Sequence, residues 1–176
     1  MITTADAGLA RTLRLLRNQG MEQRYANEIV GGNMRLTDVA AAIGRQQLQR
    51  LGRWNSRRRS NAATLTNSIT GVALPSEPPG YRHVFHQFTI RIPHNRDGLQ
   101  AHLATRNVES TVYYPIPIHR LKPYLTEAGQ PDTRWELPET DRAVGDVLSL
   151  PVHPCLSEDD LQQVIQSVND WRGHDA

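Results

Sequence analysis

The feature that most constrains this chain is one long helical pattern in its first half. Thr37 is a good N-cap, and the apolar residues after it recur on one side of a helix: Val39, Ile43, Leu48, Leu51 and Trp54. The pattern continues through Leu65 and Ile69 to Gly71, with a kink expected near Gly52. This half offers little predicted sheet for its helices to pack on. We therefore expect their natural neighbour to lie outside this chain.

Before the long helix, the sequence predicts a short β-like run, a helix and a loop. The β-like run stands at the start of the segment "MITTADAGLARTLRLLRNQG". The helix follows in the same segment, with leucines at helical spacing, and ends at Gly20, a good C-cap. Residues 21–35 are expected to form a loop, in which a Gly-Gly pair holds Asn33 and Arg35 at the entrance of the long helix. Unpaired N–H groups and the helix dipole favour anions there, so the sequence predicts an anion site.

After the Pro-rich connector "LPSEPPGYR", strand-like and helical runs alternate. Strands are expected in "HVFHQFTIRIP", "VESTVYYP" and "VLSLP", and helices in "RDGLQAHLATRN", capped by Asp97, in "PETDRAVGD" and in "SEDDLQQVIQSVNDW". In the last helix Ser157 and Asp160 resemble a capping box. One face of that helix is apolar: Leu161, Val164, Ile165, Val168 and Trp171. This half is expected to be a compact α+β unit.

Composition narrows the function classes. A hydrophobic share of 38% supports a modest core that would gain from cover by another chain, and a net charge of +2 argues against nucleic acid as the main partner. No stretch approaches the ~20 apolar residues of a membrane span, and no signal-peptide pattern is present, so we expect a cytoplasmic protein. Cys155, the only cysteine, is expected to be a small packing residue.

Several other patterns favour structural over chemical interpretations. The arginines of "GRWNSRRRSN", from Arg53 to Arg59, would spread around a helix, which favours a solvated or interface face over a phosphate-binding patch. His83 and His86 stand three apart on a predicted strand and would point to opposite faces, which argues against a metal site. No nucleophile sits on a recognisable elbow, so we assign no catalytic residue and no metal ligand.

The stretch "TVYYPIPIHRLKPY" is the strongest candidate for ligand contacts. Tyr113 and Tyr114 end a predicted strand, and prolines stiffen the loop that leads to His119. Hydroxyl and imidazole groups on a fixed turn suit a hydroxylated, anionic ligand such as a sugar nucleotide. The alternative is that Tyr113 packs inwards and His119 is a surface residue.

Three long motifs carry a family resemblance: "GGNMRLTDVAAAIGRQQLQRLGRWNSRRRSNA", "VYYPIPIH" and "LPETDRAVGDVLSLPVHPCLSEDDLQQVI". In this order and spacing, from Met1 to about Trp171, the chain resembles the C-terminal part of the DegT/DnrJ/StrS family of pyridoxal-phosphate-dependent sugar aminotransferases. The resemblance implies an α/β, aspartate-aminotransferase-type (fold type I) architecture. It implies three parts: the tail end of the cofactor-binding large domain at 1–35, a connecting helix region at 36–71 and an α+β small domain at 72–176.

The resemblance also implies roles for particular residues. In this family two subunits share each active site, and the Asn of a Gly-x-Asn-x-Arg loop reaches the cofactor phosphate of the neighbouring subunit. The matching Asn33 would donate to the phosphate of pyridoxal phosphate, and Arg35 would contact cofactor or substrate. Tyr114 and His119, in the loop matching Tyr-Pro-x-Pro-x-His, would line the nucleotide-sugar pocket. Tyr113 stands where the family often has a histidine, which leaves the keto-sugar open.

The family's lysine that holds the cofactor covalently lies upstream of the segment matching Met1. Here the only lysine is Lys122, in the substrate-side loop, where an exposed side chain is expected. Three hypotheses stay open. In the first, the chain is the C-terminal piece of a homo-oligomeric sugar aminotransferase, active only with a separately encoded N-terminal piece. In the second, it is a degenerate, non-catalytic protein that only folds or dimerises. In the third, the region from Arg53 to Arg59 binds nucleic acid, with a steep salt dependence.

Overall fold

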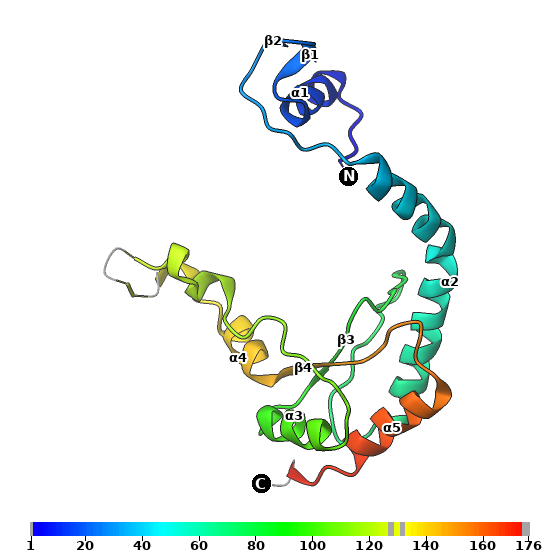
Figure 1. Ribbon diagram of the computed structural model, residues 1–176. Coiled ribbons are helices and arrows are strands. Elements are labelled where there is room, and N and C mark those ends of the chain that lie inside the picture. Colours follow the sequence, from blue (N-terminus) through cyan, green and yellow to red (C-terminus); the bar gives the residue numbers. More distant parts are fainter. Residues whose placement is uncertain (1, 127–128, 131–132, 174–176) are drawn as a thin grey trace. The chain divides into compact units, whose positions relative to one another are not determined.

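The computed structural model describes residues 2–126, 129–130 and 133–173, and the chain divides into two compact units, Met1–Arg50 and Leu51–Ala176. The division predicted at 1–35, 36–71 and 72–176 stays a prediction. Figure 1 labels the main elements along the chain, which are α1 (Ala7–Arg17), β1 (Met21–Gln23), β2 (Ala26–Asn27), α2 (Asp38–Ser68), β3 (Phe88–Arg91), α3 (Arg96–Thr105), α4 (Pro138–Asp146), β4 (Val147–Leu150) and α5 (Glu158–Asn169). None of the helices in the described ranges is long and apolar enough to cross a membrane.

The unit Met1–Arg50 contains α1, a small hairpin and the start of α2. The Asp6 side chain caps α1 by accepting a hydrogen bond from the backbone N–H of Leu9 at 2.9 Å. The loop predicted at 21–35 instead contains the antiparallel β1–β2 hairpin. The β-like run that opens the sequence forms no strand over residues 2–6. A strand needs a hydrogen-bonded partner, and none lies beside this run in the described chain.

Helix α2 begins where the sequence places it. The Thr37 hydroxyl accepts a hydrogen bond from the Ala40 N–H at 3.2 Å, and the helix continues through Gly52 without interruption to Ser68. Near its end it buries Ala62 and Leu65 in the core of the second unit. The expected kink does not break the helix, because a glycine inside a helix costs stability without removing a backbone hydrogen bond.

The core of the unit Leu51–Ala176 is built on the antiparallel pair β3–β4, in which Phe88 lies opposite Leu150. Isolated bridges extend this pair on both sides, from Ala73 to Arg91 and from Thr111 to Ser149. The strand predicted in "VESTVYYP" is therefore reduced to one bridging residue. The strand predicted at residues 83–93 is also shorter, since only Phe88–Arg91 pairs.

The three predicted helices of this unit are all present. Helix α4 matches the predicted "PETDRAVGD" exactly in its bounds, and α5 has the predicted capping box between Ser157 and Asp160. Four of the five predicted core residues are buried within α5, and the fifth, Trp171, is buried just after the helix ends at Asn169. The cap assigned to α3 is wrong: Asn95, with φ of 57°, is the N-cap residue, and Asp97 lies within the first turn.

The arginines of α2 contact the surrounding loops of the second unit. Arg57 donates to the backbone oxygen of Leu156 at 3.2 Å, and Arg58 donates to that of Phe85 at 3.3 Å. Arg59 forms an ion pair with Glu77 at 2.8 Å. These arginines therefore hold loops of the unit Leu51–Ala176 to α2.

Cys155, expected to pack inside, is exposed, so that interpretation was wrong.

Candidate functional site

The Gly-Gly-Asn-Met-Arg loop is joined to the end of α1. The Gly32 N–H donates to the Leu16 oxygen at 2.9 Å, the Gln19 N–H donates to the Gly32 oxygen at 2.8 Å, and the Met34 N–H donates to the Arg17 oxygen at 3.0 Å. The sequence placed this loop at the entrance of α2. The loop does lead into α2, but its backbone hydrogen bonds go to the end of α1, and Thr37 rather than the loop caps the first turn of α2.

Gly31 is required by close backbone packing. A Cβ atom on Gly31 would lie 2.4 Å from the backbone nitrogen of Gly20, and this distance is too short for any side chain at position 31. Gly20 itself has φ of 77°, in the left-handed region that glycine adopts without penalty. Two glycines from different segments thus let the loop lie directly against the end of α1.

Arg35 holds the side chain of Asn33 in a defined orientation. The Arg35 Nε–H donates to Asn33 Oδ1 at 3.0 Å, and the Arg35 guanidinium also reaches Asn18 Oδ1 at 3.4 Å. Because the amide oxygen is used in this way, the Asn33 NH2 group faces away from Arg35. Within the described chain that NH2 group has no hydrogen-bond acceptor and is exposed. An anion such as a phosphate is a suitable acceptor for it.

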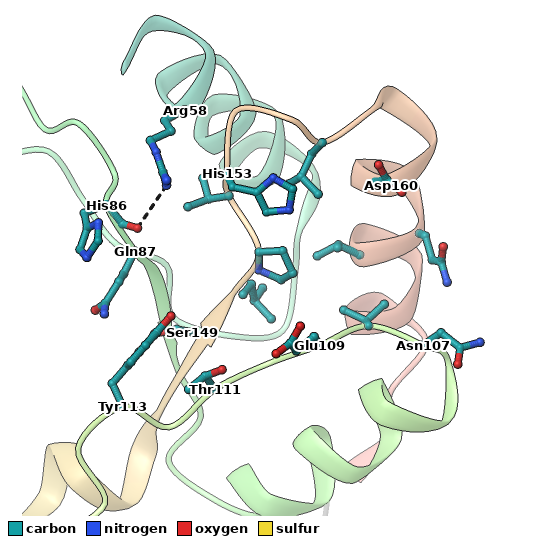
Figure 2. Close-up of a pocket in the computed structure, with 17 residues that line it drawn as sticks. Arg58, His86, Gln87, Asn107, Glu109, Thr111, Tyr113, Ser149, His153 and Asp160 are labelled. Carbon is teal, nitrogen blue, oxygen red and sulfur yellow. Dashed lines mark hydrogen bonds between the residues drawn. The ribbon is translucent and has the colours of Figure 1, made fainter. Parts of the chain in front are cut away.

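Tyr113 and Tyr114 are both exposed, and Tyr114 is the more so at 72%. Tyr113 lines a hollow of about 450 Å³ beside β4 and α5. Figure 2 shows Gln87 and Tyr113 on one side of this hollow and Asp160 of α5 on the other. Among the described residues, Tyr114 and His119 do not line it. The alternative in which Tyr113 packs inwards is therefore wrong.

His119 is buried, with 8% of its surface exposed, in a 3₁₀ turn at Ile118–Arg120. The alternative in which it is a surface residue is therefore wrong. Its Nε2 lies 3.2 Å from Oδ1 of Asp141, on α4. Arg120 contacts the same carboxylate through Nε at 2.7 Å and Nη2 at 2.5 Å. The Arg120 guanidinium, followed by His119, holds the pKa of Asp141 below its ordinary value.

Sequence reasoning missed this Asp141 cluster. The only available signal was an acidic residue in the first turn of a predicted helix, which is common at helix starts and does not indicate a partner 21 residues earlier in the chain.

The predicted site residues lie in both units. Asn33 and Arg35 belong to Met1–Arg50, whereas Tyr113, Tyr114 and His119 belong to Leu51–Ala176. Lys122 lies in an exposed 3₁₀ turn, Lys122–Tyr124, as expected. His83 and His86 precede β3 rather than lying on it, and the described residues contain no group of three or more His, Cys, Asp or Glu arranged to hold a metal.

Comparison with known proteins decides the family. The model of the DegT/DnrJ/EryC1/StrS aminotransferase family matches residues 1–169. The chain belongs to this family. A protein of Geobacillus stearothermophilus named "Pleiotropic regulatory protein" is 38% identical over 181 residues, which cover 100% of this chain and 48% of the relative. The dTDP-3-amino-3,4,6-trideoxy-alpha-D-glucose transaminase of Streptomyces venezuelae is 36% identical over 173 residues, covering 97% of this chain and 45% of the relative.

The solved structures agree with the family assignment. The crystal structure of S. venezuelae DesV superposes with a TM-score of 0.87 at 37% identity, covering 96% of this chain and 45% of that one. The predicted fold class is confirmed, because the structural neighbours are fold type I sugar aminotransferases and this chain is mixed α/β. The chain spans about half the length of the family members it matches.

Membership of the DegT/DnrJ/EryC1/StrS family implies pyridoxal phosphate as cofactor. The residues present fit one part of that group, its phosphate. Asn33 offers an exposed NH2 donor whose orientation Arg35 fixes, and the Arg35 guanidinium adds positive charge beside it. Directed donors with a nearby positive charge are what phosphate recognition requires.

Proposed function

We propose that this chain supplies the C-terminal portion of a pyridoxal-phosphate-dependent aminotransferase that acts on a nucleotide-linked keto-sugar. The family match over residues 1–169 carries the proposal. It is supported by relatives that are named as transaminases of nucleotide-linked amino sugars. In the assembled enzyme, a homo-oligomer, residues of this chain complete a site on the neighbouring subunit.

The chain's own residues bind and orient in this proposal. When bound, pyridoxal phosphate supplies the electron sink that amino-group transfer needs. Asn33 donates its amide hydrogens to the phosphate, and Arg35 keeps that amide from rotating. Tyr114 presents its hydroxyl to the sugar nucleotide from an exposed position, and Tyr113 and His119 belong to the same substrate-side loop.

The residue that holds the cofactor covalently and moves the proton is proposed to lie outside these 176 residues, in an N-terminal portion of the enzyme. Lys122 is the only lysine here, and it lies in an exposed turn. An activated lysine amine requires burial or a neighbouring cation that lowers its pKa. The exposed turn around Lys122 provides no burial of that kind, so we assign it no catalytic role.

Borohydride trapping tests which portion of the enzyme carries the lysine that binds the cofactor covalently. The chain is incubated with pyridoxal phosphate, reduced with borohydride, and any covalent adduct is located by peptide mass spectrometry. We expect no stoichiometric adduct on the chain alone, and a stoichiometric adduct on the added N-terminal portion once the two are mixed. A Lys122→Arg variant is the control and should assemble and label like the native chain. Stoichiometric labelling of Lys122 would contradict the proposal.

The role of Asn33 is tested in the assembled enzyme. Asn33→Ala removes the amide donor and is expected to weaken cofactor retention by about tenfold, the usual size of a hydrogen bond to a charged group. Asn67→Ala, at another exposed amide, is the matched control. Unchanged retention in Asn33→Ala would remove this residue from the phosphate site, and equal loss in both variants would indicate a general effect on assembly.

A second candidate function is a non-catalytic protein that acts through folding or dimerisation. One observation favours it: the Geobacillus relative carries a name that describes regulation rather than catalysis. The trapping experiment separates the two candidates. If no N-terminal portion restores labelling while the chain alone forms a stable oligomer, the non-catalytic function replaces the aminotransferase.

A further inference from the structure

The loop from Tyr113 to Arg120 has one anchored side and one exposed side. Pro117 and His119 are buried. Ile116, just before Pro117, and Ile118, between the two, are exposed. The loop is therefore held from beneath at two positions in its second half, Pro117 and His119. Tyr114, at the start of the loop, remains exposed. Its position in space therefore depends on what holds the buried side.

One carboxylate on α4 holds the last two residues of this loop. Arg120 meets Asp141 as a fork, with Nε donating to Oδ1 at 2.7 Å and Nη2 donating to Oδ2 at 2.5 Å. His119 Nε2 lies 3.2 Å from the same Oδ1. A two-pronged guanidinium–carboxylate contact fixes direction as well as distance, so it orients the loop relative to α4.

Asp141 also influences which ring nitrogen of His119 carries the proton. His119 Nε2 is buried and, in the described chain, has no aligned hydrogen-bond partner. An unprotonated Nε2 carries a partial negative charge 3.2 Å from a carboxylate oxygen, and the contact between them is repulsive even without alignment. A proton on Nε2 reverses the sign of that contact. The carboxylate therefore selects the ring form that carries its proton on Nε2.

We propose that Asp141 is a positioning residue that locks the Tyr113–Arg120 loop onto α4 and sets the proton position on His119. The inference rests on the proposed function only in treating this loop as the substrate loop. The first turn of α4 also contains a matched control residue for Asp141. Glu139 is likewise acidic in the first turn of α4, but it pairs with Arg142 of its own helix, and no hydrogen bond or ion pair joins it to the loop among the described residues.

Amide hydrogen exchange on the chain tests the locking. The reporters are the N–H groups of Arg120 and Leu121, which bond to Pro117 and Ile118 inside the turn. Asp141→Asn removes the charged fork, and we expect exchange at both reporters to accelerate about fivefold. Glu139→Gln loses a similar helix-dipole interaction and should leave both reporters unchanged. Asp141→Glu keeps the carboxylate and should restore most of the protection.

Protection in α5 serves as the folding check, since its core amides should exchange alike in every variant. Unchanged exchange at Arg120 and Leu121 in Asp141→Asn would overturn the locking. Equal acceleration in Asp141→Asn and Glu139→Gln would also overturn it, because the cause would then be the helix dipole rather than the fork.

Nitrogen-15 NMR of the histidine ring tests whether Asp141 sets the proton position on His119. A residue that only held the loop in place would not change this measurement. We expect His119 of the native chain to carry its proton on Nε2 and to lose that preference in Asp141→Asn. A native ring protonated only on Nδ1 would overturn the assignment.

The outcome for the proposed function is read separately, as binding of a nucleotide sugar by the assembled enzyme. If Asp141→Asn loosens the loop while the native enzyme binds no nucleotide sugar, the locking stands and the aminotransferase proposal fails. If the native enzyme binds the sugar and Asp141→Asn neither loosens the loop nor weakens that binding, the positioning inference fails alone.

Discussion

At the scale of single residues, the five positions of the Gly-Gly-Asn-Met-Arg loop include residues that backbone packing requires and residues whose side chains remain available to a ligand. Gly31 serves packing, because it lies directly against the backbone of Gly20. Asn33 and Arg35 use their side chains differently: these side chains bond each other, Arg35 also reaches Asn18, and both remain exposed to solvent. The resemblance pointed to the Asn and the Arg from sequence alone. The packing role of Gly31 could not be predicted, because its contact lies eleven residues away and depends on the path of the hairpin between.

Gly31→Ala tests the close approach. The added Cβ would meet backbone atoms of Gly20 and Gln19 at 2.4 and 2.9 Å, so the loop must move away from α1. We expect the Gln19 and Gly32 amides to lose protection from hydrogen exchange by about tenfold or more, as overpacking costs ~1–3 kcal/mol. Gly44→Ala is the control, because nothing lies within 4 Å of its added Cβ. It should leave both amides unchanged, and equal protection in both variants would show that Gly31 is not tightly packed.

At the scale of elements, the helices were predictable and most strands were not. Helix α4 and the capping box of α5 appear at the predicted residues because their hydrogen bonds and caps are local in sequence. Strands depend on partners elsewhere in the chain. The opening β-like run has no partner in the described residues, the run around Thr111 forms a single bridge, and the β1–β2 hairpin is too short for an alternating pattern to reveal it.

The capping box of α5 gives a pH-dependent prediction. The Ser157 backbone N–H and hydroxyl hydrogen-bond the carboxylate of Asp160, and these bonds hold its pKa below the ordinary value. Because the folded-state pKa is lowered, the stabilisation is complete above the unfolded pKa of about 4 and is lost as the pH falls through the folded value. Ser157→Ala should therefore lower the free energy of unfolding by ~1 kcal/mol at pH 7.

Urea unfolding at several pH values measures this effect. The difference between the native chain and Ser157→Ala should shrink as the pH falls from about 4 through the lowered pKa of Asp160 in the native chain, because below that pKa the carboxyl group is protonated in both proteins. Ser76→Ala, at an exposed serine in the Pro-rich connector, should match the native chain throughout. A difference that stays constant down to pH 2.5 would show that Asp160 does not contribute to the cap.

At the scale of the whole molecule, the two units differ in how much core they possess. The second unit buries a continuous apolar cluster around β3, β4, α3 and α5. Among the described residues of Met1–Arg50, Leu15 is the only buried apolar side chain other than glycine and alanine. Large apolar residues of the same unit stay exposed, with Val39 at 73%. A unit that buries so little apolar surface gains too little free energy to offset chain entropy, so we expect another chain to cover it.

Dye binding tests this expectation. The exposed apolar residues just before α2 and in its first half include Met34, Leu36, Val39, Ile43 and Leu48. We expect the chain alone to bind an apolar fluorescent dye there, because contiguous exposed apolar patches are rare on proteins whose surface is complete. The double variant Val39→Gln/Ile43→Gln should lower the fluorescence, whereas Val84→Gln, at an exposed apolar residue of the other unit, should not. Adding the N-terminal portion should suppress the signal in the native chain, because the proposed partner would occupy the same surface. A monodisperse monomer that binds no dye would show that the start of α2 needs no cover, and the expectation drawn from its apolar stripe would fail.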